Sequence, residues 1–157
     1  MTRRAAAIAI AAVGAAALAL PLRAADFRST AEAPTVLYDA PSAKARPQFV
    51  FGRDVPLEVL VAVEGWTKVR DVAGTIGWIA NKSLSERRAL QVRVPSADVR
   101  ATPDESAPVA FRAAENVLLE LAEPAASAGS TSAPGWVRVK HRDGAVGYVR
   151  ISQIFGI

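Results

Sequence analysis

The sequence predicts an all-β protein in which two tandem copies of one small β-barrel follow an N-terminal signal-peptide helix. Three observations support this prediction: an apolar leader, an internal repeat over the rest of the chain, and short valine-rich runs separated by glycine and proline. We expect residues 1–24 to be the signal peptide and residues 25–34 to be a flexible lead-in. The first domain is then expected at residues 35–88 and the second at residues 89–157.

The first 24 residues have the composition of a secretory signal peptide. Arg3 and Arg4 precede an uncharged, alanine-rich run over residues 5–20. Pro21 ends this run and the small residue Ala24 follows. The run is shorter than the roughly 20 residues that a membrane-spanning helix needs. We therefore expect cleavage after Ala24, with an uncleaved anchor as the alternative. Cleavage predicts an exported protein of the Gram-negative periplasm that has no membrane span once the leader is removed.

Charge is balanced outside this leader. The whole chain has a formal net charge of +4 and an isoelectric point near 10.0, but three leader arginines supply most of the excess. Residues 25–157 contain 16 basic and 15 acidic residues. Because nucleic-acid-binding proteins normally carry a basic face, we expect no nucleic-acid partner. The chain has no cysteine, which excludes disulfides and a lipidated cysteine.

An internal repeat organises the rest of the chain. Residues 65–84 align with residues 135–154 at an offset of 70 without a gap, and five positions are identical. Average composition would give about one identity over such a window. The identical pairs are Gly65/Gly135, Trp66/Trp136, Val69/Val139, Gly74/Gly144 and Gly77/Gly147. Upstream the offset falls to 62, which predicts a loop insertion at residues 123–135, where Ala, Ser, Pro and Gly predominate.

Both copies contain apolar runs of strand length. The predicted strands are residues 57–63, 66–70 and 75–80 in copy one, and residues 117–121, 136–140 and 145–149 in copy two. The dipeptide Asp143-Gly144 is a strong hairpin signal. Between the copies, Leu90, Val92 and Val94 alternate with polar residues and predict a half-exposed strand. Because this junction is short, we expect a fixed pair of domains.

The repeated pattern Gly-Trp-x-x-Val, followed by a hairpin and Gly-Trp/Tyr-Ile/Val, resembles the second half of a bacterial SH3-like (SH3b) domain. Copy two also resembles the family's opening at residues 98–103, whereas copy one keeps Pro41 and lacks the arginine. The resemblance covers residues 34–157 and implies two tandem small SH3-like β-barrels of about five to six strands each. It further implies a non-catalytic binding module whose partner is peptidoglycan or a peptide of another envelope protein.

Residues suited to catalysis or metal binding are scarce. His141 is the only histidine, and it lies in the predicted hairpin turn of copy two. A metal site needs several converging ligands, and a catalytic triad needs a positioned histidine. We expect His141 to be an exposed loop residue, and the acidic pairs Asp104–Glu105 and Glu120–Glu123 to be solvated. The sequence therefore predicts no enzyme activity, no catalytic residue, no metal and no cofactor.

Aromatic residues are the candidates for ligand contact. Phe51 and Phe111 are expected in the cores, whereas five rings near strand ends and after the paired glycines are candidates for a shallow groove. These candidates are Tyr38, Trp66, Trp78, Trp136 and Tyr148. Such rings give a large contact area with few rotamers to immobilise. Support of the core is the alternative role for all five.

A structural role is the alternative to binding. Exposed strand edges of the barrels would then mediate self-association. An aromatic-floored groove in both copies would favour binding, and a single apolar patch without a groove would favour assembly. The sequence leaves the ligand, the oligomeric state and the number of binding copies open.

Overall fold

The computed structural model describes residues 25–122 and 134–157. The predicted signal peptide at residues 1–24 lies outside the described residues, as does nearly all of the predicted insertion at residues 123–135. None of the described helices is long and apolar enough to cross a membrane.

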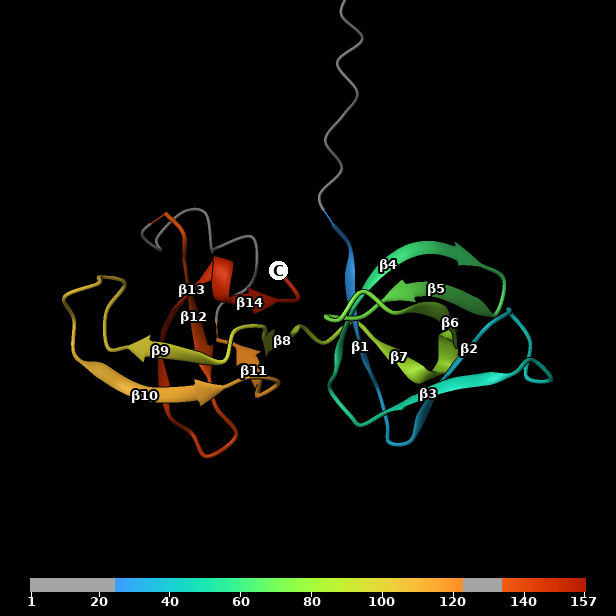
Figure 1. Ribbon diagram of the computed structural model, residues 1–157, viewed down its shortest axis with the longest axis horizontal. Helices are drawn as coiled ribbons and strands as arrows, with labels where there is room; N and C mark the ends of the chain where they lie inside the picture. The colour runs from blue at the N-terminus through green and yellow to red at the C-terminus, as the bar shows by residue number, and fades with distance from the viewer. Residues whose placement is uncertain (1–24, 123–133) are drawn as a thin grey trace, which may run out of the picture.

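Two seven-stranded antiparallel sheets of the same topology make up the described chain (Figure 1). The strand order is β3-β2-β6-β5-β4-β1-β7 in domain one and β10-β9-β13-β12-β11-β8-β14 in domain two, so each strand of domain one has its counterpart seven strands later. Both sheets curl into small barrels that lie side by side in Figure 1. The prediction of an all-β fold with two tandem barrels is confirmed.

The elements of domain one are β1 (Phe27–Thr30), β2 (Thr35–Tyr38), β3 (Pro47–Phe51), β4 (Pro56–Val63), β5 (Trp66–Arg70), β6 (Ile76–Ala80), the 3-10 turn η1 (Asn81–Ser83) and β7 (Leu84–Ser85). Those of domain two are β8 (Ala89–Val92), β9 (Ser96–Arg100), β10 (Val109–Ala114), β11 (Leu118–Leu121), β12 (Trp136–Lys140), β13 (Val146–Arg150), the turn η2 (Ile151–Gln153) and β14 (Ile154–Phe155). The strands predicted at residues 66–70 and 136–140 coincide with β5 and β12, and the other four predicted strands agree to within one residue.

The prediction of a flexible lead-in at residues 25–34 is wrong, because residues 27–30 form strand β1. This strand pairs with both β4 and β7 and completes the first sheet. Ser29 and Thr30 are completely buried, and their hydroxyl groups donate hydrogen bonds to the carbonyl oxygens of Arg87 (2.8 Å) and Gly52 (2.7 Å). Polar residues thus occupy core positions of β1, which hides the strand from a search for apolar alternation.

The strand between the copies also differs from its prediction. All four residues of β8 are buried, although a half-exposed strand was expected, because β8 lies between β11 and β14 in the second sheet. Gln91 is buried with them and donates a hydrogen bond from Nε2 to Asn116 Oδ1 (3.0 Å). Strand β8 occupies the same place in the second sheet that β1 occupies in the first. The repeated structural unit therefore includes one strand before the region in which the two copies align in sequence.

Alternate residues of the strands fill each barrel. The core of domain one consists of Leu37, Phe51, Leu57, Val69 and Ile79. Domain two has a larger core, built from Leu90, Val92, Ala97, Val99, Ala113, Leu119, Val137, Val139, Val149 and Ile154. Phe51 is buried as expected, whereas Phe111 is only partly buried and packs against the second core.

In each domain, one glycine lies directly against the neighbouring strand of the sheet. Gly77 of β6 lies against β2, and Gly147 of β13 lies against β9. A Cβ atom on Gly77 would lie 2.6 Å from Leu37 Cγ and 2.8 Å from the Tyr38 carbonyl oxygen. A Cβ atom on Gly147 would lie 2.7 Å from both the Arg100 carbonyl oxygen and Val99 Cγ1. All four distances are shorter than real Cβ contacts, so only glycine allows β2 to pack on β6 and β9 to pack on β13 this closely.

The two domains touch through the last strand of domain two. The Phe155 ring packs edge-to-face against the Phe27 ring of β1, with centroids 5.1 Å apart. Arg88 donates a hydrogen bond from Nη2 to the Gly156 carbonyl oxygen (3.2 Å). A Cβ atom on Gly156 would meet Pro56 Cβ of domain one at 3.0 Å. These contacts support the expectation of a fixed pair.

We expect Gly77→Ala to destabilise domain one by about 1–3 kcal/mol, because the added methyl group meets backbone and core atoms that cannot move away cheaply. Gly52→Ala is the matched control, since nothing lies within 4 Å of its Cβ position and its φ is not positive. Urea unfolding followed by tryptophan fluorescence measures the difference. Equal unfolding free energies for the two variants would contradict the close-packing explanation.

We expect Gly156→Ala to loosen the domain pair, because the new Cβ would lie 2.5 Å from the Ala89 carbonyl oxygen as well as against Pro56. Gly144→Ala is the control, since Gly144 also has a positive φ, of 96°, but has nothing within 4 Å. Backbone ¹⁵N relaxation should give one shared correlation time for both domains in the unaltered protein and two shorter ones in Gly156→Ala. Independent tumbling of the domains without any substitution would refute the fixed pair.

Candidate functional site

Three of the five candidate rings gather on the outward face of the domain-one sheet. The alternation that buries Leu37 and Ile79 directs the next residues, Tyr38 and Trp78, to the opposite side. These two residues are direct neighbours across β2 and β6. Trp66 begins β5 on the same side, so the rings come from three adjacent strands. We call Tyr38, Trp66 and Trp78 the aromatic face.

The rings of the aromatic face contact one another and a cation. Tyr38 and Trp66 pack edge-to-face with their centroids 5.6 Å apart. Lys68 is the neighbour of Trp78 across β5 and β6, and its Nζ lies 5.9 Å from the centroid of the Trp78 ring. All three rings are half-buried, so each leaves part of its surface open to a ligand. This combination of flat apolar surface with one ammonium group is suited to binding a chain that carries both apolar and anionic groups.

Domain two has a different surface at the same place. Trp136 occupies the position of Trp66, but Arg150 stands opposite it where domain one has Ala80 opposite Trp66. The Arg150 guanidinium carbon lies 4.3 Å from the centroid of the Trp136 ring. As a result Trp136 is only 4% exposed. Trp136 is therefore buried beneath Arg150, which agrees with the alternative role of core support rather than ligand contact.

Charged residues complete the cover over Trp136. Arg150 Nε donates a hydrogen bond to Glu105 Oε1 (2.7 Å), and Arg100 Nε lies 3.8 Å from Glu105 Oε2. Arg100 replaces Tyr38, and it neighbours Tyr148 across β9 and β13. The hollow above Trp136 is therefore lined mainly by charged side chains. Tyr148 is half-buried beside this network, so the structure does not join Trp136 and Tyr148 into a second aromatic face.

A family model described as the bacterial SH3 domain matches the chain twice, at residues 31–86 and 93–156. The chain belongs to the bacterial SH3 domain family. The resemblance noted in the sequence is thereby confirmed for both repeats. A comparison with curated protein sequences finds no match.

Solved structures that match part of the chain include NlpC1 from Trichomonas vaginalis and an NlpC/P60 family protein from Bacillus cereus. The match to NlpC1 has 17% sequence identity and a TM-score of 0.37. It covers 87% of this chain and 47% of the NlpC1 chain. The match to the Bacillus cereus protein has 13% sequence identity and a TM-score of 0.36. It covers 83% of this chain and 56% of the Bacillus cereus chain. The chain thus spans about half the length of the solved structures that it matches.

The only histidine of this tandem SH3 protein is less exposed than predicted. His141 lies in the β12–β13 turn, as expected, but its side chain is only 25% exposed. Its Nδ1 atom lies 2.9 Å from Asp143 Oδ1, and its ring packs on Phe111 with centroids 5.9 Å apart. Within the described ranges, no three His, Asp or Glu residues are grouped closely enough to hold a metal ion.

Two turn carboxylates of the second SH3 domain have lowered pKa values. The Ser106 hydroxyl and backbone N–H groups lower the pKa of Asp104 by donating hydrogen bonds to it. The backbone N–H of Ala145, followed by His141, lowers the pKa of Asp143 in the same way. A lowered pKa favours the ionised carboxylate, which accepts the hydrogen bonds that close the turn. A general acid at neutral pH needs a raised pKa instead, so neither aspartate is suited to that role.

Arg150 is the residue that sequence reasoning missed. It was visible as a difference between the repeats, because Ala80 and Arg150 are aligned at the offset of 70. Its effect was not visible, since Glu105, which holds it, lies 45 residues away in the chain. A search for differences between aligned repeats, rather than identities, would have indicated that the two surfaces diverge.

We expect Arg150→Ala to uncover Trp136 and to cost about 1 kcal/mol through the lost cation–π contact. Incorporation of fluorotryptophan gives one ¹⁹F signal for each of the three tryptophans, and the H₂O/D₂O shift of each signal reports exposure. The Trp136 signal should respond least in the unaltered protein and should approach the Trp66 signal in Arg150→Ala. Arg46→Ala, which alters an exposed arginine, is the control. If the Trp136 signal of the unaltered protein shifts between H₂O and D₂O as much as the Trp66 signal does, Arg150 does not shield Trp136 from solvent.

Proposed function

We propose that the protein is a non-catalytic periplasmic binding module that docks on peptidoglycan or on an extended peptide of an envelope protein. Bacterial SH3 domains are associated with cell-wall or peptide binding in general. The observation that carries the more specific proposal is the aromatic face of domain one, where three half-buried rings gather and Lys68 lies beside Trp78. Domain two serves in this proposal as a structural partner whose equivalent surface is covered.

The chemistry of the aromatic face supports a chain-like ligand. Aromatic rings stack on the apolar faces of sugars and on peptide side chains, and they lose little rotamer entropy on binding. Lys68 would pair with a carboxylate of the ligand at the edge of the Trp78 ring. Peptidoglycan combines sugar rings with short peptides that carry carboxylates, so both of its parts would find a partner on this surface.

Export and the lack of catalysis are parts of the same proposal. Export is supported by the composition of residues 1–24, with two arginines before an apolar run. The non-catalytic role is supported by the placement of His141, which is bound to Asp143 in a turn and packed on Phe111.

We expect Trp78→Ala to weaken binding to purified sacculi at least about tenfold, the loss that corresponds to 1.4 kcal/mol. Tyr148→Ala is the matched control, because Tyr148 occupies the equivalent position of domain two next to Arg100. Co-sedimentation over a range of sacculus concentrations measures both affinities.

Two results of this experiment would count against the proposal. Failure of the unaltered protein to sediment would remove peptidoglycan as the ligand. Equal losses in Trp78→Ala and Tyr148→Ala would remove the special role of domain one.

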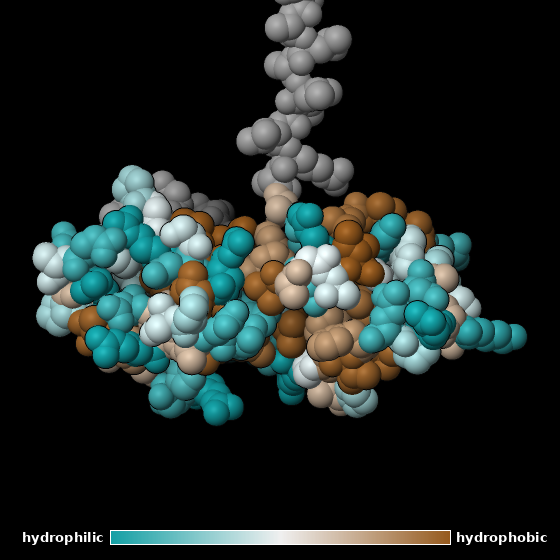
Figure 2. All heavy atoms as spheres, in the orientation of Figure 1, coloured by the Kyte–Doolittle hydropathy of each residue, from teal (hydrophilic) through white to brown (hydrophobic). Residues whose placement is uncertain are grey.

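Self-association is the second candidate function, because the outer strand of domain one is apolar. Strand β3 ends its sheet, and Phe49 and Val50 on it are 51% and 55% exposed. Figure 2 shows apolar residues gathered over domain one, whereas the visible surface of domain two is mostly hydrophilic. Exposed apolar edge strands invite pairing with a second chain. Sedimentation velocity would detect a dimer that Val50→Lys dissociates, and a monomer at all concentrations would exclude this candidate.

A further inference from the structure

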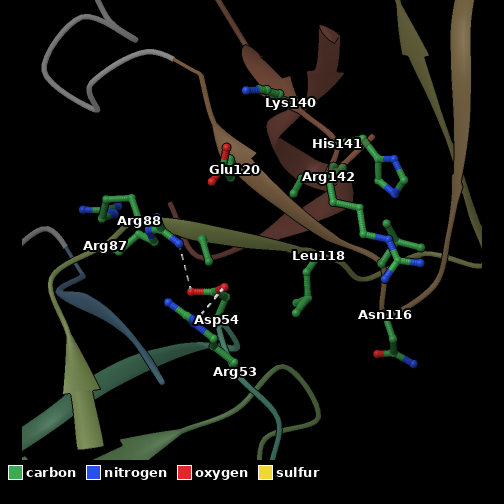
Figure 3. Close-up of a pocket in the computed structure, with 13 residues that line it drawn as sticks. Arg53, Asp54, Arg87, Arg88, Asn116, Leu118, Glu120, Lys140, His141 and Arg142 are labelled. Carbon is green, nitrogen blue, oxygen red and sulfur yellow. Dashed lines mark hydrogen bonds and ion pairs between the residues drawn. The ribbon is translucent and has the colours of Figure 1, made fainter. Parts of the chain in front are cut away.

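A cleft of about 700 Å³ lies between the two domains. Arg53 and Asp54 line it from the β3–β4 turn of domain one, and Arg87 and Arg88 line it from the junction. On the side of domain two it is lined by residues 116–120 and by the β12–β13 turn. Figure 3 shows the charged side chains of both domains arranged around the open space. The cleft shares no residue with the aromatic face.

Positive charge is concentrated in this cleft. Five cationic side chains line it, against the two carboxylates of Asp54 and Glu120, which gives a local net charge of +3. The cations are Arg53, Arg87, Arg88, Lys140 and Arg142. The chain from residue 25 onward has a net charge of only +1, with 16 basic and 15 acidic residues. The cleft is therefore far more positive than the average surface, and a concave positive surface raises the local concentration of anions.

The carboxylates of the cleft neutralise only part of this charge. Asp54 is shared between Arg53, at 3.7 Å, and Arg87, at 3.5 Å, and both are long for ion pairs. Within the described residues, Lys140 and Arg142 form no ion pair with any acidic group. Lys140 is the direct neighbour of Glu120 across β11 and β12, so its charge is partly balanced, whereas Arg142 has no acidic partner among the residues that line the cleft.

One guanidinium of the cleft is already held in place. Arg88 donates a hydrogen bond to the Gly156 carbonyl oxygen at 3.2 Å, and its guanidinium carbon lies 6.0 Å from the Phe27 ring centroid. These two contacts fix it at the contact between the domains. A planar guanidinium that is fixed in advance binds an oxyanion with less loss of side-chain entropy. Leu118 adds apolar surface to the same cleft.

We propose that this cleft binds a ligand with at least two oxyanion groups, carboxylate or phosphate, joined by a short body. Guanidinium and ammonium groups recognise both oxyanions through charge-assisted hydrogen bonds. One oxyanion would bind Arg87 and Arg88 at the junction. Lys140 and Arg142 of domain two would bind further oxyanions separately, because Figure 3 shows their side chains pointing away from each other. Such a ligand bridges the domains and therefore stiffens the pair when it binds.

The test is an NMR titration of the full chain at constant ionic strength with three probes: tripolyphosphate, citrate and acetate. We expect tripolyphosphate or citrate to shift the amide signals of residues 116–120 and 140–142 together, and acetate to have little effect. Stronger binding of tripolyphosphate would assign phosphate as the natural group, and stronger binding of citrate would assign carboxylate.

Matched variants make the test specific. Lys140→Gln and Arg142→Gln should each weaken binding of the stronger probe about tenfold. Lys82→Gln and Arg46→Gln remove the same charges from exposed sites outside the cleft and should leave the affinity unchanged. Equal affinities for all four variants, or signal changes scattered over the whole surface, would overturn the proposal. Loss of sacculus binding in Trp78→Ala tests a different surface, so the two proposals can fail separately.

Discussion

Each domain depends on one close contact between two strands. At Gly77 in domain one and at Gly147 in domain two, the neighbouring strand passes so near that no Cβ atom fits. This contact joins the β2–β3 hairpin of domain one, and the β9–β10 hairpin of domain two, to the rest of the sheet. Leu37 can then pack inward beneath β6, and Tyr38 can lie outward next to Trp78. The core and the aromatic face of domain one therefore depend on the same glycine.

Duplication preserved this constraint while the outward surface changed. Both copies keep the glycine, because the neighbouring strand leaves no room for a Cβ atom, and both have an aromatic residue directly after it. The outward neighbours are under no such constraint. Arg100 stands where domain one has Tyr38, and Arg150 stands where it has Ala80. Together with Glu105 they form a charged cover over Trp136. The two domains thus share a scaffold and differ in what that scaffold presents.

Local signals in the sequence predicted the fold well. Trp66 and Trp136 mark the first residues of β5 and β12, and the Asp143-Gly144 turn lies between β12 and β13, where it was expected. Strand β1 escaped prediction because Ser29 and Thr30 are buried through hydrogen bonds rather than through apolar contact. A pattern of apolar residues cannot show that polar side chains have partners elsewhere in the fold.

The candidate site was predicted only in part, for a related reason. Tyr38, Trp66 and Trp78 could be proposed from their type and position, and the structure brings them together. The cover over Trp136 depends on pairing between residues 45 positions apart, and the cationic cleft is assembled from the junction and three separate turns or strands. Neither has a local sequence signal, because each arises only when distant segments meet.

In the proposed function, the uncovered aromatic face of domain one contacts the ligand and its counterpart in domain two does not. The most direct test of this contact is a map of amide and indole signal changes when soluble peptidoglycan fragments are added to the ¹⁵N-labelled protein. We expect changes at Tyr38, Lys68 and Trp78 and unchanged signals at Arg100 and Tyr148. Changes centred on domain two, or equal changes on both domains, would contradict it.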